Sequence, residues 1–92
     1  MIGREVEELD HNGSEEPEKL NLNQLKKAFG LKKLKLWYNE IETIENIGHL
    51  KKLERLSLSN NRIKQISPGC FNGLILKYLS LYDNKISKIA MI

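Results

Sequence analysis

Cysteine and histidine are scarce in this sequence: Cys70 is the single cysteine, and His11 and His49 are the two histidines. A lone cysteine cannot form an internal disulfide. Cys70 occupies a small, inward position, which favours a packed residue over a nucleophile. The histidines have no second ligand at helical or hairpin spacing, so a metal site is not expected. We therefore predict no metal and no cofactor.

The motifs of catalysis and secretion are also missing. The sequence contains no glycine-rich phosphate loop, no nucleophile elbow and no paired acid motif, so we expect that the protein is not an enzyme. The first 19 residues contain no apolar run, and we expect neither a signal peptide nor a transmembrane helix. Together with the single cysteine, this predicts an intracellular, cytoplasmic protein with no membrane partner.

Charge is divided unevenly along the chain, whose formal net charge is +3. Residues 1–18 carry a net charge of −6, whereas residues 19–92 carry +9. We expect an acidic N-terminal arm, residues 1–17, ahead of a basic domain, residues 18–92. The spacing of Ile2, Val6 and Leu9 predicts a short amphipathic turn or helix over residues 2–9. Two roles are open for the arm: a solubilising tail, or a segment that folds back on the basic domain and competes with an acidic partner.

One pattern, L-x-x-L-x-L-x-x-N-x-I, recurs three times and organises the domain. Its copies begin at Leu31, Leu53 and Leu76, and their asparagines are Asn39, Asn61 and Asn84. Side chains alternate between the two faces of a strand, so both leucines of L-x-L point inward from a short strand. The asparagine amide can satisfy backbone groups that the following turn leaves unpaired, which predicts a structural role for it.

The segments around the motifs predict the rest of the domain. In residues 18–30, Leu22, Leu25 and Ala28 fall on one side, as in a helix ending at Gly30 or in the return half of an incomplete repeat. Either interpretation makes residues 18–30 a cap over the N-terminal end of the stack. The return segments have apolar residues at a period near three, which favours tight helical turns or extended chain over a long α-helix.

The three copies resemble leucine-rich repeats, and residues 20–90 are similar to the short, 22-residue intracellular class. That class includes a phosphatase-1 regulatory subunit and an axonemal dynein light chain. The resemblance implies an α/β leucine-rich-repeat solenoid with a short parallel sheet of three strands on its concave face and a helical N-terminal cap. It also implies a scaffold that binds a partner protein through the concave sheet. No C-terminal cap is recognisable, so self-association through an open C-terminal end is a further prediction.

The outward positions of the predicted strands form the candidate partner-binding surface. It contains the only tryptophan and all three tyrosines, while Phe29 and Phe71 take inward positions. The candidate residues are Lys33, Lys35, Trp37, Tyr38, Arg55, Ser59, Asn60, Tyr78, Tyr82 and Asp83. Tryptophan, tyrosine and arginine are enriched where interfaces bind most strongly. We expect a groove between Trp37 and Tyr82, beside basic residues that favour an acidic or extended segment of another protein.

Two alternatives stay open. Together with Trp37 and Tyr38, three lysine pairs would suit an RNA-contacting basic adaptor, which uses phosphate charge and base stacking. The pairs are Lys26–Lys27, Lys32–Lys33 and Lys51–Lys52. Binding to RNA should fall steeply with salt, whereas a partner held by aromatic burial should lose much less. The other alternative is a truncated repeat fragment with no independent binding function, in which the aromatic residues only cover the sheet.

Overall fold

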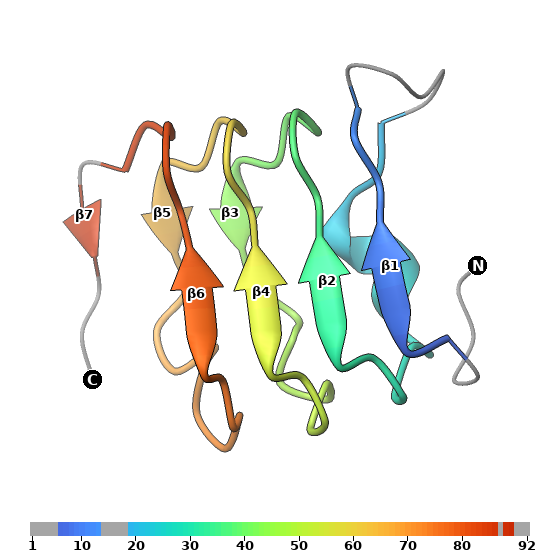
Figure 1. The fold of residues 1–92 in the computed structure, drawn as a ribbon. Coiled ribbons are helices and arrows are strands. Elements are labelled where there is room, and N and C mark those ends of the chain that lie inside the picture. The colour runs from blue at the N-terminus through green and yellow to red at the C-terminus, as the bar shows by residue number, and fades with distance from the viewer. Residues whose placement is uncertain (1–5, 14–18, 87, 90–92) are drawn as a thin grey trace.

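The computed structural model describes residues 6–13, 19–86 and 88–89. Its strands form two parallel sheets (Figure 1), one of four strands in the order β1-β2-β4-β6 and one of three in the order β3-β5-β7. The elements are β1 (Glu8–Asp10), η1 (Leu22–Leu25), β2 (Lys33–Lys35), β3 (Thr43–Ile44), β4 (Arg55–Ser57), β5 (Gln65–Ile66), β6 (Tyr78–Ser80) and β7 (Lys88–Ile89). The return segments are therefore extended chain with very short strands, one of the two forms predicted for them.

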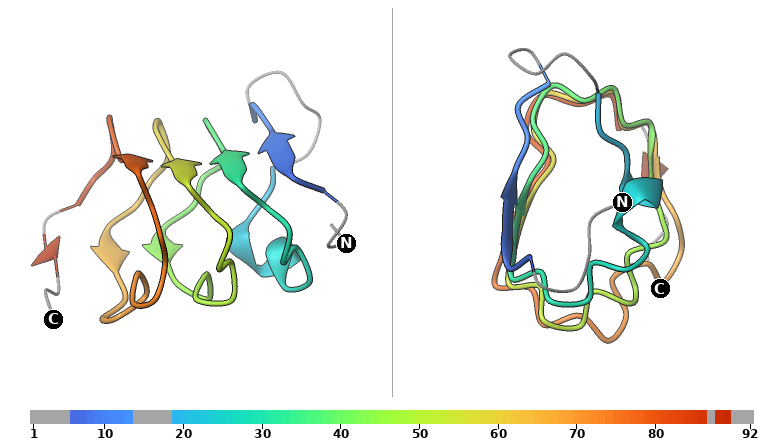
Figure 2. Two further views of the ribbon diagram at one scale, coloured as in Figure 1. Left: turned by 60° about the horizontal axis from the view of Figure 1, so that its bottom comes forward. Right: turned by 90° about the vertical axis from the view of Figure 1, so that its right-hand side faces the viewer.

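The repeat period sets the register of both sheets. Leu34 in β2 lies opposite Leu56 in β4, which lies opposite Leu79 in β6. The chain passes through the four-stranded sheet and returns through the three-stranded one, and Figure 2 shows successive turns following the same outline around a common interior. Equivalent motif positions therefore form rows across the strands, as expected for a leucine-rich repeat.

The core consists of the inward positions of the motif. In the first two repeats both leucines of L-x-L are fully buried, namely Leu34, Leu36, Leu56 and Leu58. Burying one such side chain stabilises the fold by roughly 1.5–3 kcal/mol. Leu79 of the third repeat is 42% exposed, because β6 is the last strand of its sheet and no described strand covers it.

The N-terminal segment differs from the sequence prediction. We predicted a turn or helix in an arm outside the repeat domain, but Glu8–Asp10 form β1, which pairs in parallel with β2. The four-stranded sheet thus has one strand more than the three predicted. Leu9 lies opposite Leu34 and packs partly buried against the core, while its two acidic neighbours are exposed. The rest of the predicted arm, residues 1–5 and 14–17, lies outside the described residues.

The predicted helical cap is not confirmed. Within the described ranges η1 is the only helix, a 3-10 helix of four residues. Its first turn is closed by Asn21, whose side chain accepts a hydrogen bond of 3.0 Å from the Asn23 N–H. Leu22, Leu25 and Ala28 are buried, so this segment covers the core with chain that resembles the return half of a repeat. No helix found in the described parts is long and apolar enough to cross a membrane.

One inward prediction in this segment is wrong. Phe29 is 42% exposed, and its ring packs edge-on against the His49 ring with 5.5 Å between centroids. The His49 ring nitrogen Nε2 in turn lies 2.7 Å from the Leu25 carbonyl oxygen. Phe29 therefore covers a polar contact at the surface instead of filling the core. Phe71, the other phenylalanine predicted to point inward, packs partly buried against the core.

Candidate functional site

The candidate site lies on the outer face of the four-stranded sheet, formed by the side chains that point away from the core. Strand register places these side chains in rows. The first row contains Glu8, Lys33, Arg55 and Tyr78, and the second contains Asp10, Lys35, Ser57 and Ser80. Each row thus begins with an acid on β1, continues with a base on β2 and ends with an uncharged residue on β6.

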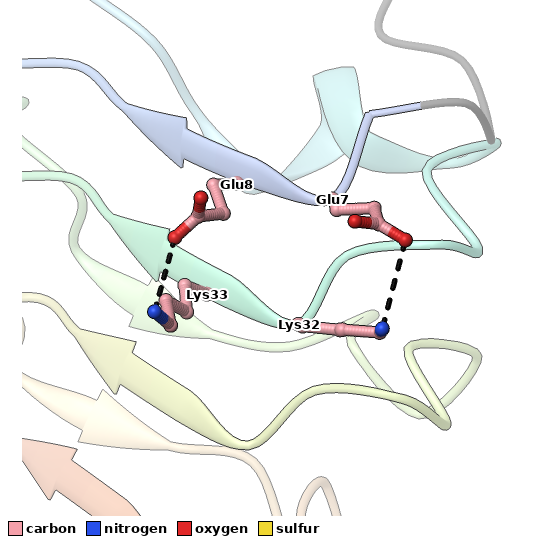
Figure 3. A network of polar contacts seen from close by, with 4 residues as sticks. All are labelled: Glu7, Glu8, Lys32 and Lys33. Carbon is pink, nitrogen blue, oxygen red and sulfur yellow. Dashed lines mark ion pairs between the residues drawn. The ribbon is translucent and has the colours of Figure 1, made fainter.

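The charged end of this face is a hollow of about 200 Å³, which we call the charged hollow. Its described lining residues are Glu8, Leu9, Asp10, Lys33, Lys35 and Arg55. Figure 3 shows two ion pairs beside it, with 3.2 Å from Lys33 Nζ to Glu8 and 3.6 Å from Lys32 Nζ to Glu7. All four side chains are exposed, so each pair stabilises the fold by roughly 0–1 kcal/mol. Of the basic residues that we expected to select an acidic partner, Lys33 is already paired with an acid of the same chain, and Lys35 and Arg55 line the same hollow as Glu8 and Asp10.

The uncharged end is a second, open hollow of about 480 Å³, which we call the neutral hollow. Its described lining residues are Asn12, Trp37, Tyr38, Ser57, Ser59, Asn60, Tyr78, Ser80 and Tyr82. None of these lining residues carries a formal charge. Of the ten predicted residues, six line this hollow and three line the charged hollow. The tenth, Asp83, is not among the described lining residues of either hollow.

Hydrogen bonds between side chains form the floor of the neutral hollow. The indole N–H of Trp37 donates to Ser57 Oγ at 2.8 Å, and the Oγ atoms of Ser59 and Ser80 are also 2.8 Å apart. A weaker contact of 3.5 Å joins Ser57 Oγ to Ser59 Oγ. Because an indole N–H only donates, Ser57 must accept this bond, and its own proton is free to point elsewhere. The bond also holds the Trp37 ring toward β4.

Two cations lie over the rings at the border between the hollows. Lys35 Nζ is 5.7 Å from the centre of the Trp37 ring, and the Arg55 guanidinium carbon is 5.8 Å from that of Tyr78. Such cation–π contacts contribute about 0.5–1 kcal/mol at exposed sites. Both contacts hold rings that line the neutral hollow. Tyr82, at the far side, remains 77% exposed.

Tyr38, at the rim of the neutral hollow, has an unusual backbone conformation. Its φ is +58°, and the equivalent residues of the next repeats, Asn60 and Asp83, have φ of +58° and +56°. The left-handed region is tolerated by asparagine and aspartate but costs a bulky residue roughly 1–2 kcal/mol. The Tyr38 side chain is also 45% exposed. A strained residue with an exposed aromatic ring is a candidate for function, because strain of this kind clusters at functional sites.

Sequence reasoning missed three residues of the neutral hollow. Ser57 and Ser80 were on the predicted outward face but were not chosen, because their contribution depends on hydrogen bonds made in the fold. Asn12 was missed because β1 was not recognised as a strand. Placing Leu9 opposite Leu34 in the repeat frame would have brought Asn12 beside Trp37.

Among the described residues, the potential metal ligands lie apart and the Cys70 thiol is partly buried. No group of three or more potential ligands from histidine, cysteine, aspartate or glutamate comes together in the parts of the chain described. Burial raises the pKa of the Cys70 thiol, an effect that a backbone hydrogen bond partly opposes. A thiol with a raised pKa carries less thiolate and reacts more slowly.

Comparison with known proteins agrees with the repeat pattern. Residues 29–86 match the profile of a family described as "Leucine rich repeat". Lumican of Gallus gallus is 38% identical over 80 residues, which are 85% of this chain and 22% of lumican. Toll-like receptor 3 of Boselaphus tragocamelus is 47% identical over 47 residues, which are 50% of this chain and 5% of the receptor. No solved structure matches the chain significantly.

These matches show the family but not the repeat class. The chain spans 22% of the length of lumican, and the similarity does not single out the 22-residue intracellular class. Membership of that class and a cytoplasmic location therefore stay predictions. Leucine-rich repeats are generally protein-interaction modules and are typically non-catalytic. From its motif, its parallel sheets and its relatives, the chain belongs to the leucine-rich-repeat family.

Proposed function

We propose that the chain is a non-catalytic module that binds another protein through the outer face of the four-stranded sheet, with the neutral hollow as the centre of the interface. Trp37, Tyr38 and Tyr82 present rings around a floor of serine hydroxyls. Rings with polar tips supply large contact areas at interfaces, and such residues carry most of the binding free energy. A solvent-exposed cluster of this kind is typical of an interaction site.

The conformation of Tyr38 is the observation that carries the proposal. Its backbone φ of +58° would suit asparagine, the residue found at the same position of the next repeat. The strained tyrosine nevertheless places a ring at the rim of the hollow. An unstrained asparagine at this position would serve as well if the side chain only covered the sheet. A role in contacting a partner explains why a tyrosine ring stands there instead.

The RNA alternative has less support. Lys32 and Lys33, one of the lysine pairs that suggested it, lie beside Glu7 and Glu8. The described lining of the neutral hollow contains no cation to meet a phosphate. Nucleic-acid affinity depends on phosphate neutralisation. The two cations over these rings, Lys35 and Arg55, share the charged hollow with the acids Glu8 and Asp10, which reduces the positive charge offered to a phosphate.

Selection of peptides from a random display library against the wild-type chain tests the proposal. The selected peptides are then measured against Tyr82→Ala and against Gln65→Ala, a control at an exposed position of β5 in the other sheet. We expect Tyr82→Ala to weaken binding about tenfold or more and Gln65→Ala to leave it unchanged, with both variants folded by circular dichroism. Equal affinity for Tyr82→Ala and wild type would overturn the proposal.

A further inference from the structure

Resting on the function proposed above, we infer that the partner segment seated in the neutral hollow is proline-rich, adopts the polyproline II conformation and runs across the strands. The inference depends on three features of the hollow: the spacing of the strands that carry its rings, the chemistry of its lining and the pairing of the strand beneath it.

The spacing of the strands that carry the two rings matches one turn of polyproline II. Trp37 follows β2 and Tyr82 follows β6, each two residues beyond the paired positions Lys35 and Ser80, and β4 lies between these strands. Neighbouring strands are about 4.7–4.9 Å apart, so the two backbone positions are separated by about 9.5 Å across the sheet. Polyproline II rises about 3.1 Å per residue with three residues per turn, or about 9.3 Å per turn. A segment crossing the strands would thus present residues i and i+3 to the two rings.

The lining of the hollow suits the chemistry of proline. Proline rings stack on aromatic side chains, and Trp37, Tyr38, Tyr78 and Tyr82 supply four of them. A proline has no N–H but a strongly accepting carbonyl, so a proline-rich segment needs donors from its partner. Tyrosine hydroxyls and the Asn60 amide can donate to such carbonyls. Recognition of proline-rich segments in aromatic-lined grooves works in this way.

A charged segment would fit the same hollow poorly. None of its described lining residues is charged, and the two cations at its border, Lys35 and Arg55, already share the charged hollow with acids of the same chain. An acidic or basic side chain over the serine floor would therefore lose water without a lining charge to pair with. The bases nearby, Lys33 and Lys35, already share the charged hollow with Glu8 and Asp10. Charge complementarity therefore favours an uncharged segment.

Addition of a partner strand is not available at this place. β4 is hydrogen-bonded to β2 on one side and to β6 on the other, so its backbone cannot pair with a further strand. Strand addition requires an exposed sheet edge. A segment over β4 must therefore be recognised through side chains and its own carbonyls, which is how polyproline II, without internal hydrogen bonds, is bound.

Trp37 is the only tryptophan, so its fluorescence reports directly on the hollow. The test titrates an uncharged decaproline peptide into the full chain, with a glycine–serine peptide of equal length as the control. We expect a saturable change in Trp37 emission with decaproline alone, little affected by salt. Tyr82→Ala should weaken this binding about tenfold or more. No saturable change, or an equal response to the glycine–serine peptide, would overturn the inference.

A second pair of peptides tests the spacing. One has proline at every third position with alanine between, and the other has the same composition scrambled so that no two prolines are three residues apart. The first should bind more tightly, and equal affinity would contradict the geometry. Library peptides that lack proline yet require Tyr82 would preserve the proposed function and refute the proline-rich partner. Library peptides insensitive to Tyr82→Ala would refute both.

Discussion

The side-chain oxygen of Asn61 accepts a hydrogen bond of 2.9 Å from the backbone N–H of Asn39, the same motif position in the preceding repeat. The Asn61 amide donates back to the carbonyls of Leu36 at 2.6 Å and Leu58 at 3.0 Å. Asn84 likewise donates to the Leu58 carbonyl at 2.9 Å. Each motif asparagine therefore ties its turn of chain to the one before, which confirms the structural role predicted for it.

Asn61→Ala should destabilise the fold by about 2–5 kcal/mol, because it removes several buried hydrogen bonds and leaves their backbone partners unsatisfied. Urea denaturation followed by circular dichroism measures the change in the free energy of unfolding. Asn84→Ala is the matched control, because Asn84 is half-buried and forms hydrogen bonds across the same kind of turn. We expect it to lower the free energy of unfolding by less than Asn61→Ala does. An equal loss for the two variants would contradict the importance of burial.

Gly13→Ala should detach β1 from the sheet. A Cβ atom at Gly13 would clash with the Tyr38 carbonyl oxygen, whereas one at Gly48 would meet nothing within 4 Å. Backbone hydrogen bonds of this segment would be lost, such as the bond of 2.8 Å that the Gly13 N–H donates to the Trp37 carbonyl oxygen. We expect hydrogen exchange of the β1 amides to accelerate in Gly13→Ala and to stay slow in Gly48→Ala. Unchanged protection in Gly13→Ala would show that β1 tolerates the added atom.

Tyr38→Asn should separate stability from binding. Asparagine tolerates the left-handed backbone, as Asn60 does in the next repeat, so the free energy of unfolding should rise by about 0.5–1 kcal/mol. The ring at the rim of the neutral hollow is lost at the same time, so affinity for peptides selected on the wild type should fall. Thermal denaturation and peptide titration measure the two effects. A variant that is both more stable and equally able to bind would remove Tyr38 from the interface.

Cys70 should react slowly with iodoacetamide at neutral pH. Burial raises the pKa of its thiol, so the thiolate, which is the reactive species, is scarcer than in an unstructured peptide and increases only as the pH rises. Mass spectrometry of samples taken over time gives the rate of alkylation. The same chain unfolded in urea serves as the control and should react faster. Equal rates in the folded and unfolded chain would contradict a protected thiol.

The repeat pattern was sufficient to predict the pairing and register of β2, β4 and β6. The rows of Leu34, Leu56 and Leu79 follow from the motif alone, since equal spacing in sequence becomes stacking in space. β1 was not predictable in the same way, because Leu9 is a single apolar residue between acids. This segment forms a strand because it pairs with β2, and its own sequence lacks the repeat pattern. For the cap, the apolar spacing kept a helix and the return half of a repeat both open, because burial of Leu22 and Leu25 needs that spacing but not a long helix.

The candidate site could be predicted only in part. The alternation of inward and outward side chains along each strand was enough to predict that the aromatic residues share one face. The bond from Trp37 to Ser57, the position of Lys35 over the Trp37 ring and the left-handed backbone of Tyr38 depend on three-dimensional contacts. The division of the face into a charged and a neutral hollow also required β1, which supplies Glu8 and Asp10.

Site-specific photocrosslinking tests the central claim, that the neutral hollow is the centre of the binding surface. Benzoylphenylalanine is introduced in place of Tyr82, which is 77% exposed, and in a second variant in place of Gln65 on the other sheet. Both variants are irradiated with peptides selected on the wild-type chain. We predict crosslinked product from position 82 and none above background from position 65. Crosslinking from position 65 alone, or equally from both positions, would contradict binding through this face.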